Sequence, residues 1–265
     1  MDPSVDDAAH AALGQRRAAN APAALLAQLA AATRFLTIVP LGGRVAPIGE
    51  SALFFPLVGL ALGGVLVLLD RVAAPIVPLI VRDVLLVAAL ALLSGGRHLR
   101  GLARTARGLV VADRARALAV MREGGAGVLG AVAIAVVLVL KVVSLGALPV
   151  STRAAALLYA PMLARWSMVV LAFGSRPARP DGVGRTMVST VKFREFGVAT
   201  VGALWILLAY TAARGLLAIL VVAVVTISCR IFVHARLGGV TGDLLGAIVE
   251  INETLVLATF TLAAR

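Results

Sequence analysis

Charged residues, aromatic residues and cysteine are all scarce in this 265-residue chain. Charged residues make up 14% of it, against about 25% in soluble domains, while hydrophobic residues reach 61%. An ordinary soluble protein is therefore excluded. Cys229, the single cysteine, can form neither an internal disulfide nor a CxxC metal site. Aromatic residues, at 5%, suit interfacial anchors better than platforms for nucleic-acid bases.

Long apolar runs dominate the rest of the sequence. Stretches of about 20 apolar residues cross a bilayer as helices, which satisfy their own backbone hydrogen bonds in lipid. We therefore predict an all-α fold, a polytopic integral membrane helical bundle with about seven transmembrane helices. The expected spans are 52–69, 74–94, 128–149, 154–173, 197–213, 216–233 and 244–262.

The net charge of +12 is concentrated in the connections between these spans. Arginine and lysine gather near 97–123 and 174–196, and such an excess is typical of cytoplasmic loops. We expect these loops and 234–243 on the cytoplasmic side beside anionic lipid, with no nucleic acid as partner. Residues 1–30 are expected to form a cytoplasmic tail and an interfacial helix, and residues 31–265 a single transmembrane domain.

Four arginines follow one another at helical spacing after a Gly-Gly pair. Arg97, Arg100, Arg104 and Arg107 fall on one face of a helix, where like charges repel unless they meet water, phosphate or lipid headgroups. The face is either a membrane-surface helix or a cradle for a pyrophosphate, which guanidinium groups bind in bidentate fashion. His98, beside this face, is either a hydrogen-bonded structural residue or a catalytic base.

A glycine-rich turn precedes the last span. Its glycines allow close backbone approach to a ligand, and Asp243 can cap the following helix or bind a cation. Glu250 and Glu253 follow on the same helical face, and acids within a span usually mark function. Because hard oxygen ligands favour Mg²⁺, we predict a magnesium site here. The turn residues expected to contact substrate are Gly238, Gly239, Thr241 and Gly242.

Two cations lie inside apolar runs. Lys141 either snorkels to the interface or pairs with an acid of the site or with a phosphate. Arg165, between Pro161 and Trp166, is either an interfacial residue or a substrate-binding one. Their depth makes both of them candidates for the same site.

Several of these residues stand in a familiar order: Phe35–Pro40, Phe54–Leu60, the Gly-Gly-x-His-Leu segment, Lys141, Pro161 with Arg165-Trp166, and the block 238–253. The chain resembles the cobalamin synthase (adenosylcobinamide-GDP ribazoletransferase) family of bacterial and archaeal membrane proteins. The resemblance implies a multi-pass transferase of the cytoplasmic (inner) membrane that joins adenosylcobinamide-GDP to α-ribazole, or to its 5′-phosphate, with Mg²⁺ and loss of GMP. Other late cobalamin enzymes are expected partners beside the lipid bilayer.

The chain departs from the family where the motif after His-Leu has three aspartates, which here are Arg100, Arg104 and Arg107. Glu123 keeps one acid of a later motif. A guanidinium has no lone pair for a metal. The chain is thus predicted to be a transferase or, alternatively, a catalytically impaired corrinoid- and nucleotide-binding scaffold; a small-solute transporter fits less well because the acids gather at one end.

The resemblance and the residues together assign roles. The expected catalytic residues are Asp243, His98 and Lys141, and the expected metal ligands are Asp243, Glu250, Glu253 and Glu123. The expected substrate-binding residues are Arg97, Arg100, Arg104, Arg107, Arg165, Gly238, Gly239, Thr241 and Gly242. The distance between the arginine face and Asp243 separates a remodelled site, in which they are close, from a lost one.

Overall fold

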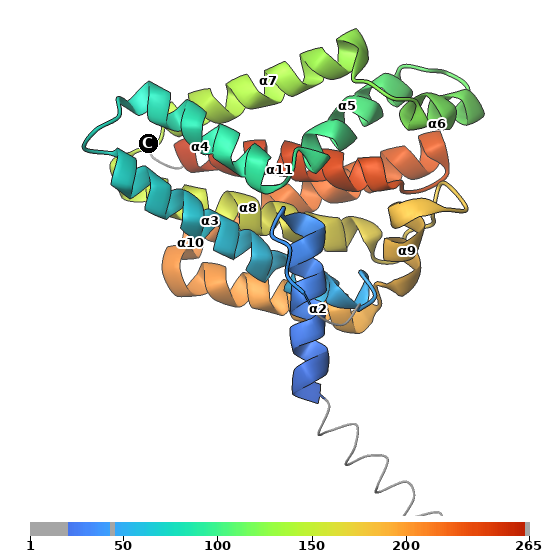
Figure 1. The fold of residues 1–265 in the computed structure, drawn as a ribbon, viewed down its shortest axis with the longest axis horizontal. Helices are drawn as coiled ribbons and strands as arrows, with labels where there is room; N and C mark the ends of the chain where they lie inside the picture. Colours follow the sequence, from blue (N-terminus) through green and yellow to red (C-terminus); the bar gives the residue numbers. More distant parts are fainter. Residues whose placement is uncertain (1–20, 43–45, 263–265) are drawn as a thin grey trace, which may run out of the picture.

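The computed structural model describes residues 21–42 and 46–262, and these form a bundle of helices (Figure 1). The elements are α2 (Ala21–Leu36), η1 (Glu50–Phe54), α3 (Phe55–Ala73), α4 (Leu79–Leu93), α5 (Arg97–Leu109), α6 (Arg114–Arg122), α7 (Gly127–Gly146), α8 (Val150–Ala172), α9 (Gly182–Thr190), α10 (Phe193–Leu237) and α11 (Gly242–Leu262). An isolated bridge joins Pro177 to Val240. The predicted all-α class is confirmed.

Helices α8 and α11 form the centre of the bundle, and most of their side chains are buried. Helix α3 packs closely against α8 because it carries glycines at the contact. A Cβ atom at Gly59 would lie 2.7 Å from the Cα atom of Met162, and one at Gly63 would lie 2.6 Å from the Cα atom of Leu158. Small residues allow this close approach, which is how helices associate in lipid.

The outer helices turn apolar side chains away from the protein. Val128 and Val139 on α7 and Leu220 on α10 are all more than half exposed. Because such a surface is unfavourable in water, these helices are the lipid-facing side of the bundle. The uncharged faces of the predicted spans thus point outward, while the charged residues gather at the ends or in the interior.

Within residues 21–42 and 46–262, five helices are long and apolar enough to cross a membrane, or up to six if α4 and α5 form one bent span. The expected number, about seven, lies above this range. Helix α4 has 15 residues, about 22 Å at ~1.5 Å per residue, which is short for a ~30 Å hydrocarbon core. Its helix begins only at Leu79 because Pro78 has extended backbone angles, φ −54° and ψ 145°, at the N-cap.

Helix α10 comprises 45 residues, of which Arg214–Leu237 form a candidate membrane span. If straight, it would be about 67 Å long, yet residues near both of its ends contact the end of α8. The ring of Phe193 lies 6.4 Å from that of Phe173, and Arg230 donates a hydrogen bond of 2.7 Å to the carbonyl oxygen of Gly174. The helix therefore folds back on itself, along the path of the hairpin predicted from 197–213 and 216–233 (Figure 1).

The connections that carry the basic residues meet at one end of the bundle, with α6, α9 and the start of α11 (Figure 1). Arg236 donates hydrogen bonds to the carbonyl oxygens of Val111 and Ala112. The amide of Val240 donates to the carbonyl oxygen of Arg176 at 2.8 Å. The three loops therefore lie at the same end of the bundle.

Helix α2 lies across the other helices rather than along them (Figure 1). The predicted boundary between tail and transmembrane domain, at residue 30, falls inside this helix. Its position suits the interfacial helix expected from the sequence. Residues 1–20 of the predicted tail lie outside the described residues.

Candidate functional site

The site forms where α5 crosses the start of α11. Both helices carry a glycine at the crossing: a Cβ atom at Gly101 would lie 2.7 Å from the carbonyl oxygen of Asp243, and one at Gly246 would lie 3.2 Å from the Cα atom of His98. Larger side chains would hold the helices apart. Two glycines far apart in the sequence therefore bring the arginine helix and the acidic turn together.

The glycine pair before α5 sets the direction of that helix. Gly95 and Gly96 have φ angles of 64° and 62°, in the left-handed region that costs glycine little. They end α4 and turn the chain by 88° into α5. The predicted helix over the four arginines is confirmed, and its direction is what places its polar face toward α11.

A third wall comes from the connection between α8 and α9. Gly184 packs against the turn before α11, because a Cβ atom there would lie 2.6 Å from the amide nitrogen of Gly242. The amide of Ala178 donates to the carbonyl oxygen of Val240 at 3.0 Å. This connection was expected to be a basic loop, and here it covers the site.

Between these three walls lies a cavity of about 290 Å³. Its charged and polar lining comprises Arg97, His98, Arg104, Arg179, Asp181, Arg185, Thr241 and Asp243, and glycine backbone at 182, 184, 242 and 246 completes it. Four arginines face two aspartates, so the lining carries a net positive charge. The cavity favours an anionic ligand.

Asp243 lies between two of these arginines. Its carboxylate oxygens are 3.5 Å from Arg104 Nη1 and 3.6 Å from Arg179 Nη1, and its side chain is 14% exposed. Burial lowers the pKa of the Arg179 guanidinium, and the neighbouring Asp243 opposes that shift. Arg104 of the arginine face is therefore adjacent to the acid, which is the arrangement expected of a remodelled site.

Thr241, not Asp243, caps α11. The Thr241 hydroxyl accepts a hydrogen bond of 3.2 Å from the amide of Leu244, three residues on, as an N-cap side chain does. Asp243 is thereby released from the capping role that the sequence allowed, and it turns toward the cavity. Of the four turn residues expected at the site, Thr241 and Gly242 line the cavity, whereas Gly238 ends α10 with a φ of 73°.

His98 lines the cavity from α5 and is 5% exposed. Its Nδ1 atom has no hydrogen-bond partner within the described part of the chain. A buried polar atom without a partner costs free energy, so this nitrogen is available to a ligand in the cavity.

The other predicted arginines of α5 serve different contacts. Arg97 donates hydrogen bonds to the carbonyl oxygens of Phe35 (2.7 Å) and Thr37 (2.6 Å), and so fastens the end of α2 to the cavity wall. Arg107 pairs with Glu123 at 3.3 Å, away from the cavity. Arg100 is exposed. Only part of the predicted cradle therefore faces the site.

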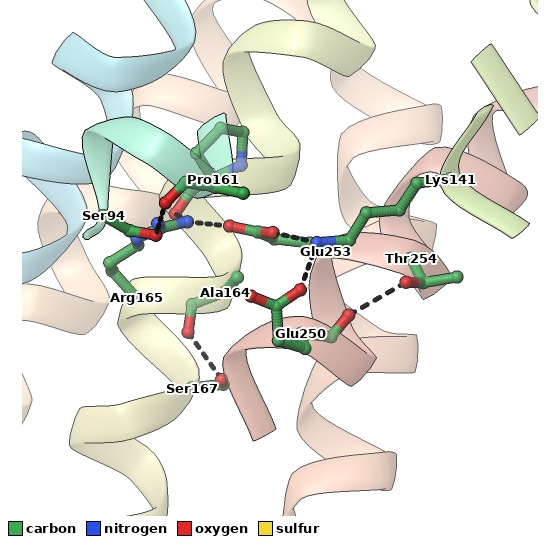
Figure 2. Close-up of polar contacts among 10 residues, drawn as sticks. Ser94, Lys141, Pro161, Ala164, Arg165, Ser167, Glu250, Glu253 and Thr254 are labelled. Atoms are coloured by element: carbon green, nitrogen blue, oxygen red, sulfur yellow. Dashed lines mark hydrogen bonds and ion pairs between the residues drawn. The ribbon is translucent and has the colours of Figure 1, made fainter. Parts of the chain in front are cut away.

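Deeper in the bundle, two acids and two cations form a separate buried network (Figure 2). Lys141 donates to Glu250 at 2.6 Å and also to Glu253, which in turn accepts from Arg165. All four side chains are at most 4% exposed. The prediction that Lys141 pairs with an acid is confirmed, and the charges of the network cancel.

The residues do not fit the predicted magnesium ion. Of its four expected ligands, Asp243 is matched by arginines, Glu250 and Glu253 are matched inside the buried network, and Glu123 pairs with Arg107. Residues 21–42 and 46–262 contain no group of three or more His, Cys, Asp or Glu side chains that could hold a metal ion. In the structure each of these four carboxylates is paired with a basic side chain, so none of them is free to serve as an oxygen ligand of Mg²⁺.

Arg179 and Arg185 were not identified as site residues from the sequence. Both line the cavity, from the connection before α9 and from α9 itself. The one sequence signal that could have identified these two arginines is the basic charge of 174–196, which was used only to predict the side of the membrane on which this loop lies. Nothing in their spacing relates them to Asp243, because that contact depends on folding.

Comparisons with known proteins agree along nearly the whole chain. A family model described as cobalamin-5-phosphate synthase matches residues 28–261. A Geotalea daltonii protein named adenosylcobinamide-GDP ribazoletransferase is 39% identical over 236 residues, 86% of this chain and 94% of that protein. A Roseiflexus sp. protein of the same name is 38% identical over 90% of this chain and 90% of its own length. A Pseudomonas aeruginosa protein of that name is 37% identical over 89% of this chain and 98% of its own length. No solved structure matches the chain.

Proposed function

This chain belongs to the cobalamin-5-phosphate synthase family, and we propose that it is an adenosylcobinamide-GDP ribazoletransferase that works at the cavity between α5, α9 and α11. The relatives' name supplies adenosylcobinamide-GDP and ribazole as substrates, and the description of the family model favours the 5′-phosphate form of the ribazole. The observation that carries the assignment to this cavity is Asp243, held at 3.5 Å and 3.6 Å from two arginines in a lining of four arginines and two aspartates.

The reaction exchanges one phosphorus–oxygen bond for another. A ribose hydroxyl oxygen that is free in both α-ribazole and its 5′-phosphate attacks the phosphorus attached to cobinamide, the bond from that phosphorus to the oxygen bridging to GMP breaks, and GMP leaves with that oxygen. The hydroxyl proton passes to a base. Such transfers depend mainly on positioning and on neutralising charge on the phosphate oxygens.

The lining offers groups for each requirement. Arg104 and Arg179 approach the same carboxylate from opposite walls, so a diphosphate between them meets two guanidinium groups. Asp243, or Nδ1 of His98, is placed to accept the hydroxyl proton. Lys141 lies in the buried network and not in this lining, so its role is to fix α7 against α11.

The size of the cavity limits what it holds. At about 290 Å³ it is smaller than a nucleotide-linked corrinoid, so the diphosphate and the groups beside it occupy it while the corrinoid lies outside. The basic end of the bundle faces the cytoplasm of a bacterial or archaeal cytoplasmic membrane, following the excess of arginine in its loops. Both water-soluble substrates then approach from the cytoplasm.

The test is GMP release from adenosylcobinamide-GDP and α-ribazole by the full chain in lipid. Asp243→Asn is expected to lower the rate about hundredfold or more, as loss of a positioned acid–base group does. Glu50→Gln, which changes an exposed acid outside the cavity, is the control and is expected to keep the rate. If the wild-type chain releases no GMP while a chain with aspartate at positions 100, 104 and 107 does, the scaffold function replaces the transferase.

A further inference from the structure

The cavity is lined by four arginines and two aspartates, and both aspartates already pair with arginine: Asp243 with Arg104 and Arg179, and Asp181 with Arg122. Arg104 comes from α5 and Arg179 from the connection before α9, so the two guanidinium groups approach from different walls. The described residues gather no metal-binding cluster. A guanidinium has five N–H donors and no lone pair, so it can replace a cation toward phosphate but cannot hold one.

The two arginines make no short contact to Asp243, although Nη2 of Arg179 donates a hydrogen bond of 2.7 Å to the carbonyl oxygen of Leu118. Their distances to Asp243, 3.5 Å and 3.6 Å, exceed the roughly 2.7–2.9 Å of a direct charge-assisted hydrogen bond. Their side chains are 30% and 14% exposed, so an entering anion reaches them. Phosphate oxygens at hydrogen-bonding distance would therefore compete effectively with the single carboxylate.

Two buried nitrogen atoms of the lining residues also lack a hydrogen-bond partner among the described residues. Nδ1 of His98 and Nε of Arg179 are buried and make no hydrogen bond to the described residues. Such atoms are costly when left unsatisfied. A ligand with several acceptor oxygens would satisfy the Arg179 Nε–H, and a protonated hydroxyl or phosphate oxygen would satisfy His98.

We propose that this cavity binds the diphosphate of its nucleotide-linked substrate without a divalent cation, with Arg104 and Arg179 in the place of the ion. The identity of the substrate rests on the proposed function, whereas the mode of binding rests on the residues of the cavity. Arg104, where the resemblance gives the family an aspartate, thus changes the means of charge neutralisation and keeps the anion site.

The experiment measures binding of GDP, used as the diphosphate probe, to the full chain in phosphatidylcholine nanodiscs, which contain no anionic lipid to compete. We expect the dissociation constant in excess EDTA to lie within about twofold of that in excess Mg²⁺. Loss of GDP binding by about tenfold or more in EDTA would overturn the proposal, and so would absence of GDP binding in both buffers.

Variants assign the binding to the two arginines. Arg104→Ala and Arg179→Ala are each expected to weaken GDP binding about tenfold, the loss of one charged hydrogen-bonding group. Arg116→Ala removes the same charge from an exposed position on α6 outside the cavity and is expected to stay within about twofold. Equal weakening by all three would mean that net charge, not the cavity, binds GDP.

A charge-reversal variant tests the exchange of arginine for metal directly. Arg104→Asp places a second carboxylate beside Asp243, so its GDP binding is expected to need Mg²⁺ where the wild-type binding does not. Measuring GDP binding and GMP release side by side distinguishes failure of this proposal from failure of the proposed function. GDP binding in EDTA without GMP release would refute the transferase alone, whereas GMP release that requires Mg²⁺ together with metal-dependent GDP binding would refute the present inference alone.

Discussion

Removal of the Lys141 ammonium group should destabilise the bundle through one particular acid. Glu253 is shared between Lys141 and Arg165, but within the described residues Lys141 is the one cation that pairs with Glu250, at 2.6 Å. The Glu250 side chain is 4% exposed. Lys141→Met therefore leaves a buried carboxylate uncompensated, and removal of one partner of such a pair costs about 3–5 kcal/mol.

The matching double variant restores neutrality. In Lys141→Met/Glu250→Gln, the remaining charges are Arg165 and Glu253, which still pair. The double variant should therefore be more stable than the Lys141→Met single variant by about 2 kcal/mol, within the range of coupling energies between contacting residues. The destabilised Lys141→Met variant thus becomes more stable when the Glu250 carboxylate is replaced as well.

The assay is equilibrium unfolding in mixed micelles, titrated with SDS and followed by circular dichroism. Arg116→Met, an exposed cation outside the network, serves as control and should change the free energy of unfolding by less than about 0.5 kcal/mol. The reasoning fails if Lys141→Met unfolds within about 1 kcal/mol of the wild type, or if the double variant is as unstable as the single one.

Two further changes test how the site is assembled. Gly101→Val would place a Cβ atom 2.7 Å from the carbonyl oxygen of Asp243, so it should separate α5 from α11. It should lower the free energy of unfolding by about 1–3 kcal/mol in the same assay and should weaken GDP binding. The control Ala106→Val, at a partly buried position on α5, should change neither the stability nor the GDP binding. Thr241→Val removes the N-cap oxygen of α11 and should cost about 1 kcal/mol, which Thr241→Ser should largely restore. Equal stability of the valine and serine variants would contradict the capping role.

Much of the fold follows from local chemistry. Long apolar runs predict helices in lipid because each helix satisfies its own backbone groups, and the loops rich in arginine predict one common side. The sequence was less informative about where spans end. Pro78 shortens α4, and the chain reverses direction within α10, of which only Arg214–Leu237 is a candidate span.

The site was predicted in its parts but not in its grouping. Asp243, Glu250 and Glu253 lie on one helical face in the sequence, which suggested a single metal site. In the structure Asp243 meets Arg104 and Arg179 at the cavity, while the two glutamates turn to Lys141 and Arg165 deeper in the bundle. Helical spacing gives the face on which a side chain lies, but it does not say which helix packs on each turn of that face.

Residue types and their order were therefore enough to establish a helical membrane protein, its family and the residues from which a site could be built. The division of the acids between two places depended on packing. Glycines at 101 and 246 let α5 cross α11 at the first turn, and Lys141 reaches α11 only one to two turns farther along. In a medium of low dielectric constant, a carboxylate pairs with the cation that packing brings within a few ångströms of it. Each of these ion pairs joins residues more than 50 positions apart in the chain, so the sequence alone does not reveal the partner.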